Sequence, residues 1–269
     1  MGVDFLYKTP VGRSLLWAVM HSGVIRPAAA FLNSGASRCL IRPYAKKNGI
    51  DLRGFPEKFH SFGDFFGRYR PLPPVELPEN VLISPCDSFL SAYPIEDGTC
   101  LKIKGSAYRI RDLVTDEEQA EKFAGGLCMI FRLCPSDYHH FCYIDDCEQL
   151  PTRFVPGQLH SVQPIACETV PVYRLNRRQW SLLDTDHFGL VAQIEIGALM
   201  VGGMVHVKEG GRCARGEEMG YFTLSGSTVV LLFTKSFREN FRFLPALLPA
   251  FGTDREVKVH QAQSLGTLN

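Results

Sequence analysis

The sequence predicts an α+β fold in which N-terminal helices precede a β-rich body, built as a sandwich or a partly closed barrel. Three observations predict this fold. Apolar residues recur at helical spacing near the N-terminus, a cluster of prolines follows within residues 71–79, and short apolar or β-branched runs separated by turn residues come after it. We therefore expect a helical segment at residues 1–70 and a β-rich domain at residues 71–269.

An amphipathic helix over residues 11–23 is the first predicted element. Its apolar positions are Val11, Leu15, Leu16, Val19 and Met20, with Trp17 beside them. Two interpretations are open: the apolar face packs on the protein's own core, or it lies at a membrane interface. Packing on the core is the commoner arrangement. The excess of basic residues in this region, 11 Lys/Arg against 4 Asp/Glu over residues 1–70, favours the membrane.

The prolines at positions 71, 73, 74 and 78 mark the boundary after this segment. Proline fixes φ and lacks an amide donor, so this density excludes a helix or a central strand. One further helix is predicted over residues 116–124. Thr115 and Glu118 form a capping-box pattern at its start, and Gly125 follows as a stop.

Most of the remaining chain is typical of β-strands. Short runs rich in apolar or β-branched residues alternate with turn residues, without internal repeats. The predicted strands are residues 101–104, 127–133, 170–175, 180–183, 190–196, 199–207 and 228–233.

Composition limits the class of protein. The chain has 269 residues, 45% of them hydrophobic, with a net charge of +1, which indicates a folded domain and gives no sign of a nucleic-acid-binding protein as a whole. Nine cysteines at irregular spacing and the lack of a signal-peptide pattern indicate reduced thiols in a cytoplasmic protein. No apolar run reaches the roughly 18–20 residues that span a bilayer, so we expect any membrane contact to be peripheral.

A turn of small residues before the last predicted strand has two interpretations. Gly226 and Ser227 form an ordinary turn into a core strand, or they carry chemistry. A serine after glycine in a strained turn can attack the carbonyl of the preceding peptide bond and form an ester. Elimination then cuts the chain, and hydrolysis of the resulting dehydroalanine leaves a pyruvoyl group. This chemistry needs a base and a carboxylate that orients the base.

Six segments in order resemble the phosphatidylserine decarboxylase family, over roughly residues 60–235. They are SFGDFF at 61–66, SPCD at 84–87, DYHHF at 137–141, PGQLHSV at 156–162, EIGALMVG at 195–202, and RGEEMGYF with GSTVV at 215–222 and 226–230. Each segment alone is weak evidence, but their shared order makes the resemblance specific.

The resemblance implies self-cleavage between Gly226 and Ser227, giving a β chain of residues 1–226 and an α chain of residues 227–269 that stay together as a heterodimer. It implies that Ser227 becomes a covalent pyruvoyl cofactor and that Asp87 is a charge-relay aspartate. From the residues alone, Asp87 is as well explained by a cap on the turn after Pro85. His139 aligns with a histidine that acts on substrate.

One position departs from the family pattern. Many members carry a second histidine three residues after the first, where this sequence has Cys142, although a subgroup resembles this sequence in lacking it. His139 is our preferred base, and His160 is a substitute. His160 has the alternative of being an ordinary, partly buried strand residue. We expect no metal, because the spacing of Cys142, Cys147 and the nearby histidines fits no common zinc site.

The function implied is decarboxylation of phosphatidylserine to phosphatidylethanolamine through a Schiff base with the pyruvoyl group. The implied partners are phosphatidylserine and an anionic membrane surface, at the cytoplasmic face of the cell membrane. Two alternatives stay open: a pyruvoyl decarboxylase of another serine phospholipid, and a lipid-binding relative that is never cleaved.

Overall fold

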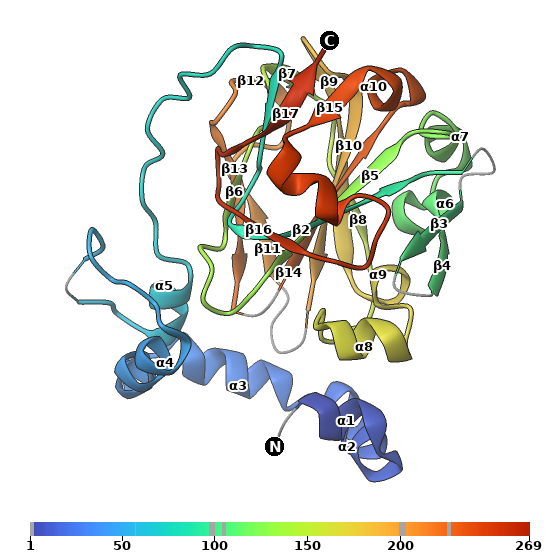
Figure 1. The fold of residues 1–269 in the computed structure, drawn as a ribbon. Helices are drawn as coiled ribbons and strands as arrows, with labels where there is room; N and C mark the ends of the chain where they lie inside the picture. The colour runs from blue at the N-terminus through green and yellow to red at the C-terminus, as the bar shows by residue number, and fades with distance from the viewer. Residues whose placement is uncertain (1–2, 57, 97–99, 104–105, 199–202, 225–226) are drawn as a thin grey trace.

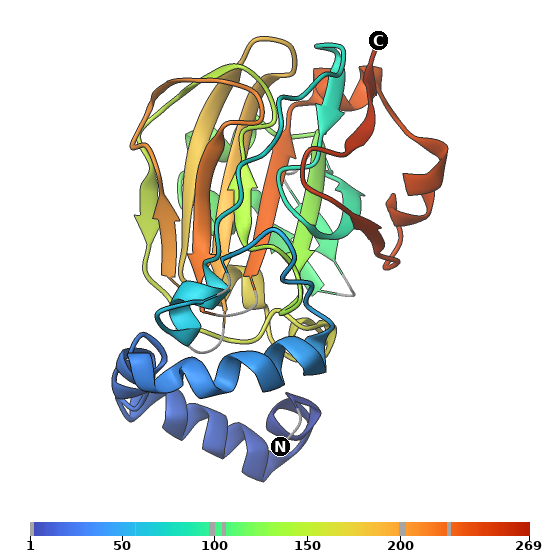
Figure 2. The same ribbon diagram turned by 90° about the vertical axis from the view of Figure 1, so that its left-hand side faces the viewer.

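The N-terminal helices gather at one end of the molecule, and the body is built from strands with short helices beside them (Figure 1). The structure is a computed structural model that describes residues 3–56, 58–96, 100–103, 106–198, 203–224 and 227–269. The N-terminus lies in the helical end and the C-terminus at the opposite end, as Figures 1 and 2 both show.

Short helices form a layer beneath the ends of the strands (Figure 2). They are α1 (Val3–Lys8), α2 (Pro10–His21), α3 (Ile25–Leu32), the 3-10 helix η1 (Gly35–Leu40), α4 (Ile41–Asn48) and α5 (Phe62–Phe66). The helix predicted over residues 11–23 is confirmed as α2. Thr9 caps it by accepting a 2.9 Å hydrogen bond from the Gly12 amide, and Pro10 occupies the first turn, where its missing amide costs nothing.

Helix α2 is partly packed and partly exposed. Leu16 is buried and belongs to the same apolar cluster as Tyr7 of α1. Val11 and Trp17 are 70% and 63% exposed. The packing expected for one side of the helix is therefore confirmed, and its other side is exposed. Across the described residues, we find no helix with the length and apolar character needed to cross a bilayer.

A nine-stranded antiparallel sheet forms the centre of the body, in the order β12-β7-β9-β10-β14-β5-β2-β16, with β8 pairing on β9. Its strands are β2 (Ser88–Pro94), β5 (Leu127–Leu133), β7 (Cys147–Gln149), β8 (Arg153–Val155), β9 (Arg178–Thr185), β10 (Gly189–Gly197), β12 (Gly211–Cys213), β14 (Ser227–Phe233) and β16 (Val257–Val259). Strand β14 is entirely buried and pairs along its whole length with both β10 and β5.

Two smaller sheets cover one face of the large sheet. They are β11-β13-β6, from Gly203–His206, Glu218–Thr223 and His140–Cys142, and β1-β17-β15, from Val81–Ile83, Ser264–Leu268 and Phe241–Phe243. Helix α10 (Lys235–Asn240) and the 3-10 helix η2 (Pro245–Ala250) add to this face. The described strands do not close into a barrel, and the predicted α+β class is confirmed.

Short helices cover the opposite face. They are α6 (Ile110–Val114), α7 (Glu117–Glu121), α8 (Pro164–Thr169) and α9 (Val172–Leu175), which follow the hairpin of β3 (Cys100–Ile103) and β4 (Ser106–Arg109). Successive residues of a strand point to opposite faces, so β14 contributes to both cores. Val229, Leu231 and Phe233 face the small sheets, whereas Val230 and Leu232 face the helices.

The strand predicted over residues 170–175 is wrong. Val170 ends α8, and residues 172–175 form helix α9, which buries Val172 and Tyr173. A short run of buried apolar residues does not distinguish a strand from a helical turn. Here Pro171 opens the turn, and the Asn176 amide closes it by donating to the Val172 carbonyl.

The helix predicted over residues 116–124 is shorter, and its cap is a different residue. Helix α7 spans Glu117–Glu121, and Asp116 caps it by accepting from the Gln119 amide. Thr115 instead ends α6 in a left-handed conformation, with φ of 54°. Aspartate caps a helix as well as threonine does. Because Thr115 already ends α6, the next residue, Asp116, caps α7.

The other predicted strands are recovered with shifted ends. Residues 127–133 match β5, while 180–183, 190–196 and 228–233 lie within β9, β10 and β14. Of the strand predicted over 101–104, residues 101–103 lie in β3 and residue 104 lies outside the described residues. Of that over 199–207, residues 203–206 form β11, and residues 199–202 lie outside them.

Leu232→Ala should lower the free energy of unfolding by about 2–5 kcal/mol, because it removes a buried side chain from the central strand and leaves a cavity. Urea denaturation followed by fluorescence measures the change. The matched control is Leu248→Ala, whose side chain is 55% exposed and which should change stability by less than about 0.5 kcal/mol. Equal effects of the two substitutions would contradict the described core.

Candidate active site

Ser227 is the first residue of β14 and lies between two other strands. It pairs with Leu133 of β5 and with Gly197 of β10. The residue is 1% exposed, and its hydroxyl oxygen has no hydrogen-bond partner among the described residues. Buried polar atoms are almost always paired, so an unused hydroxyl calls for an explanation. Gly226, on the other side of the predicted cleavage bond, lies outside the described residues.

The backbone is strained shortly before Ser227. Leu224 has φ of 34°, in the left-handed region that residues with a side chain rarely adopt. Such a conformation costs on the order of 1–2 kcal/mol per residue and persists only where the surroundings impose it. Leu224 is 3% exposed and packs in a cluster with α4 and α5. The helical layer thus holds the segment that leads to Ser227.

His139 faces the same space between sheets as Ser227. In β14, Ser227 shares a face with Val229, which packs in the core beneath the small sheets. Phe141 of β6 belongs to that same core, and His139 precedes it by two residues. The carbonyl of His139 accepts a 2.9 Å hydrogen bond from the Phe222 amide, which extends the pairing with β13 as far as this residue.

The ring of His139 is held in one orientation. Its Nδ1 lies 2.9 Å from the carbonyl oxygen of Asp137, and the side chain is fully buried. A carbonyl oxygen only accepts, so Nδ1 carries a proton. In the neutral ring, Nε2 then carries the lone pair. The ring of Phe66 packs on the imidazole, with centroids 4.2 Å apart.

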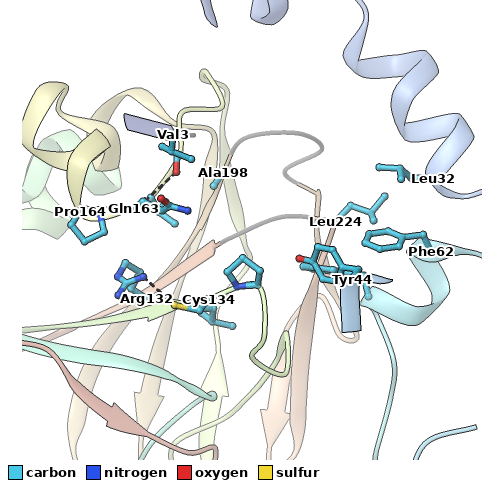
Figure 3. A pocket seen from close by; sticks show the side chains of 15 residues that line it. Val3, Leu32, Tyr44, Phe62, Arg132, Cys134, Gln163, Pro164, Ala198 and Leu224 are labelled. Carbon is cyan, nitrogen blue, oxygen red and sulfur yellow. Dashed lines mark hydrogen bonds between the residues drawn. The ribbon is translucent and has the colours of Figure 1, made fainter. Parts of the chain in front are cut away.

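A cavity of about 530 Å³ lies between the helical layer and this end of the large sheet. It is lined by Val3, Leu32, Tyr44, Phe62, Phe66, Arg132, Leu133, Cys134, Pro135, Ser161, Val162, Gln163, Pro164, Ala198 and Leu224. Figure 3 shows Leu32, Tyr44, Phe62 and Leu224 on one side and Val3, Gln163 and Pro164 on the other, with Arg132 below this second group and Cys134 next to Arg132. Leu133 is the strand partner of Ser227, and Phe66 contacts His139, so the cavity adjoins both candidate residues.

Arg132 carries the only charge among the cavity-lining residues that the structure describes. Its guanidinium forms a two-pronged pair with Glu256, including a 3.0 Å bond from Nε to Oε1, and donates from Nη1 to Cys134 Sγ at 3.2 Å. It also lies over the ring of Phe89. The sequence analysis missed this residue. An arginine within an otherwise apolar strand was the available signal.

Asp87 lies on the loop between β1 and β2. Its Oδ1 accepts a 2.8 Å hydrogen bond from the Gln261 amide, and Arg70 and His260 lie 3.9 and 3.7 Å from its carboxylate. The same loop reaches Cys142, whose amide donates to the Pro85 carbonyl at 2.9 Å. The segment with Asp87 therefore lies against the position where many family members have their second histidine. Burial raises the pKa of Cys142 to about 12, so its thiol is neutral at physiological pH.

His160 is bound on both sides of its ring. Its Nδ1 lies 3.3 Å from the Tyr7 hydroxyl of α1, and its Nε2 lies 2.7 Å from Gln158 Oε1. Burial lowers the pKa of His160 below 6.5. The side-chain Nδ2 of Asn176 donates both to the His160 carbonyl and to the carbonyl of Gly197, the strand partner of Ser227. The Asn176 side chain thus links the backbone of His160 to the end of β10.

His140 has a separate, enclosed environment. Its ring stacks between Tyr138 and Tyr221, with centroids 4.7 and 4.9 Å apart. Its Nδ1 lies 2.6 Å from Glu218 Oε1, and its Nε2 lies 3.1 Å from the Gly67 carbonyl. By strand alternation, His140 points away from the space that His139 faces. The ring joins β6 and β13 to the end of α5.

A buried ion pair that the sequence analysis did not identify lies in the core beneath the small sheets. Glu195 of β10 is fully buried, and its Oε2 lies 3.1 Å from His206 Nε2 of β11. The other ring nitrogen of His206 lies 3.1 Å from the Thr152 hydroxyl. Burial alone would lower the pKa of His206, but the Glu195 carboxylate raises it above 6.5 overall. The pair joins the large sheet to β11-β13-β6.

Comparison with known proteins identifies the family. The family model described as phosphatidylserine decarboxylase matches residues 62–248. A phosphatidylserine decarboxylase proenzyme 2 of Clostridium acetobutylicum is 38% identical over 237 residues, covering 86% of this chain and 80% of the relative. Proenzymes of Desulfitobacterium hafniense Y51 and Clostridium perfringens are 38% and 34% identical, each covering 87% of this chain and 82% of the relative.

An apolar cavity beside a buried serine, together with these relatives, defines a decarboxylase of the proenzyme class. The chain belongs to the phosphatidylserine decarboxylase family.

Glu195→Gln should flatten the decline of thermal stability as pH rises above about 6.5, the ordinary pKa of histidine. The raised pKa of folded His206 means that the pair stabilises the protein fully below pH 6.5 and loses this effect as pH rises through the folded pKa. Melting temperatures across this range measure it. The pKa of His187 is raised by Asp145 in the wild type and in the variant alike, so its effect on the pH dependence cancels in the comparison. Identical pH slopes would contradict the assigned pair.

Proposed function

We propose that this chain decarboxylates phosphatidylserine to phosphatidylethanolamine by means of a pyruvoyl group made from Ser227. The observation that carries the proposal is the buried hydroxyl of Ser227, which has no partner among the described residues and adjoins an apolar cavity. The family's proenzyme names, given to relatives of this chain, agree with a processed form.

Self-cleavage would begin with attack of Ser227 Oγ on the carbonyl carbon of Gly226. The peptide C–N bond breaks as an ester forms. Removal of the proton from the α-carbon of residue 227 then expels the carboxylate of Gly226 and leaves a dehydroalanine. Water releases ammonia and leaves the ketone at the new N-terminus. The strain at Leu224 supports this proposal, because a segment held out of its preferred conformation is easier to rearrange.

The residues around Ser227 fit a small, uncharged ketone. Leu133 and Gly197 flank the position, and neither brings charge. When present, the pyruvoyl group supplies an electron sink that takes up the substrate amine and accepts electrons as carbon dioxide leaves. The protein has to orient the carboxylate, exclude water and deliver one proton. Phe66 and Leu133 exclude water from this end of the cavity.

His139 is the proposed base for cleavage and the proposed proton donor for decarboxylation. Its Nδ1 proton is fixed on the Asp137 carbonyl, so its Nε2 is the atom that takes or returns a proton. As the base, Nε2 of the neutral ring takes a proton and the ring becomes an imidazolium, and this imidazolium is the form that returns the proton in decarboxylation. Asp87 is kept in the proposal as the charge-relay aspartate that the resemblance implies. Its described contacts are with Arg70, His260 and the Gln261 amide, whereas the ring of His139 is oriented by the Asp137 carbonyl.

Arg132 is the proposed contact for the anionic phosphate of the substrate. It is the charged side chain of a mostly apolar described lining, and a guanidinium paired with Glu256 has further N–H groups that match phosphate geometry. The acyl chains would leave through the helical layer. Val11 and Trp17 of α2 and Phe31 of α3 are exposed there among basic residues, which supports docking on an anionic membrane surface at the cytoplasmic face.

A lipid-binding relative that is never cleaved is the second candidate, favoured by one observation. Cys142 stands where many members have a histidine, and its raised pKa excludes a thiolate base at neutral pH. Denaturing gel electrophoresis separates the two: an enzyme gives fragments of residues 1–226 and 227–269, and a binding protein gives one uncut chain. An assay on other serine phospholipids tests the headgroup.

Ser227→Ala should abolish both cleavage and decarboxylation, because it removes the attacking oxygen and the precursor of the ketone. Gel electrophoresis and release of carbon dioxide measure the two losses. The matched control is Thr228→Val, which removes the neighbouring buried hydroxyl on the opposite face of the same strand and should leave cleavage intact. Decarboxylation by Ser227→Ala would overturn the proposal.

His139→Gln should slow self-cleavage by about 10²–10⁴-fold, the usual contribution of a general base. His160→Gln should slow it by less than about tenfold, because the ring of His160 is already engaged by Tyr7 and Gln158. The time course of fragment appearance on gels measures both rates. Equal slowing by the two substitutions would remove the distinction between the histidines.

A further inference from the structure

A second cavity, of about 340 Å³, lies where the turn between α2 and α3 meets the body of the protein. It is lined by Met20, Gly23, Arg26, Gly157, Gln158, Leu159 and Arg177. It shares no lining residue with the cavity beside Ser227. No acidic residue is among its described lining, whereas two arginines are. The cavity is therefore electropositive.

Neither arginine has an ion pair among the described residues, in contrast to Arg132, Arg153, Arg212 and Lys258. The Nε of Arg177 is buried and has no hydrogen-bond partner there. A buried guanidinium N–H that is left unpaired costs free energy, and the usual explanation is a water or an anion at the site. A phosphate or carboxylate is the anion that two guanidinium groups bind best.

The backbone fixes Arg177 in this position. Gly157 lies so close to residues 175–177 that a Cβ would meet the Leu175 carbonyl at 2.5 Å and the Arg177 amide at 2.6 Å. The Gln158 amide donates to the Leu175 carbonyl at 2.8 Å, and the Arg177 amide donates to the Gln158 carbonyl at 2.9 Å. The two segments form one rigid wall, and Arg26 lies across the cavity from it on α3.

The surroundings favour a lipid over a free anion. Val24, two residues before Arg26, is 54% exposed, and Trp17 on the preceding helix is 63% exposed. Exposed apolar side chains beside an electropositive cavity match the boundary between headgroups and acyl chains. We propose that Arg26 and Arg177 bind the phosphate of an anionic phospholipid, at a site separate from the catalytic cavity. This inference extends the proposed membrane association and rests on it.

Lipid binding at this site would also fix the helical layer relative to the body of the enzyme. Gln158 contacts His160, and His160 contacts Tyr7 of α1, the helix that carries the cavity-lining residue Val3. A lipid held by Arg26 and Arg177 would thus fix the helical layer against the body, with the catalytic cavity facing the same membrane.

Arg26→Gln with Arg177→Gln should weaken binding of the full chain to vesicles of phosphatidylcholine and phosphatidylglycerol by about tenfold or more, the value of one to two charge-assisted hydrogen bonds. Sedimentation with vesicles measures this. Phosphatidylglycerol lacks the serine amine, so the catalytic cavity does not bind it as a substrate. The matched control is Arg42→Gln with Lys46→Gln, which removes the same charge from α4, outside the cavity.

Equal losses in the two double variants would overturn the proposal in favour of diffuse electrostatic attraction. Binding of glycerol 3-phosphate as tight as that of the vesicles, and lost in the first variant, would overturn the lipid as its source. Arg26→Gln alone, on an exposed helix position, keeps the test valid should Arg177→Gln fail to fold. Activity of the wild-type chain on detergent-dispersed phosphatidylserine is measured separately. If the wild-type chain lacks this activity, the proposed function fails independently of the vesicle result.

Discussion

The pairing of β14 with β10 on one side and β5 on the other is the constraint on which the rest of the structure depends. Hydrogen bonds on both sides fix the register, so Ser227 is held between Leu133 and Gly197 at the end of the sheet. The alternation of side chains then decides which core each residue joins. Ser227 and Val229 point to the small sheets, and Thr228 and Val230 point to the helices. A slip of one residue would exchange the two faces and remove Ser227 from the space that His139 occupies.

The segment before β14 crosses between two sheets. Strand β13 belongs to the sheet β11-β13-β6, whereas β14 belongs to the large sheet. The connection from β10 to β11 makes the same crossing, and Glu195 and His206 join the two sheets beside it. The two sheets, the Glu195–His206 pair and the helical layer around Leu224 therefore hold the chain on both sides of the segment between β13 and β14. Backbone strain is retained where so many contacts oppose its release.

Long periodic elements could be predicted from the sequence, and contacts between distant elements could not. Helix α2 and strand β5 were recovered because their patterns extend over many residues. The strand expected at residues 170–175 is wrong because a run of six residues with a few buried apolar side chains forms a helical turn as readily as a strand. Motifs identified Ser227 and His139. Their position on the same side of the large sheet depends on how two sheets pack. The roles of three further features could not be predicted because they arise from contacts with segments far away in the sequence: Arg132, Arg177 and the Glu195–His206 pair.

Because β14 lies in the interior of the large sheet, cleavage of the chain in front of it would leave the C-terminal fragment held within that sheet. The 43 residues from 227 onward include β14, β15, β16 and β17; β14, β16 and β17 pair with strands of residues 1–226, and β15 pairs with β17. Withdrawing them would require opening the large sheet along both edges of β14. We therefore expect subunit exchange between cut molecules to be as slow as global unfolding. Mixed heterodimers could then form only during refolding, and the processed protein would behave as one irreversibly assembled particle.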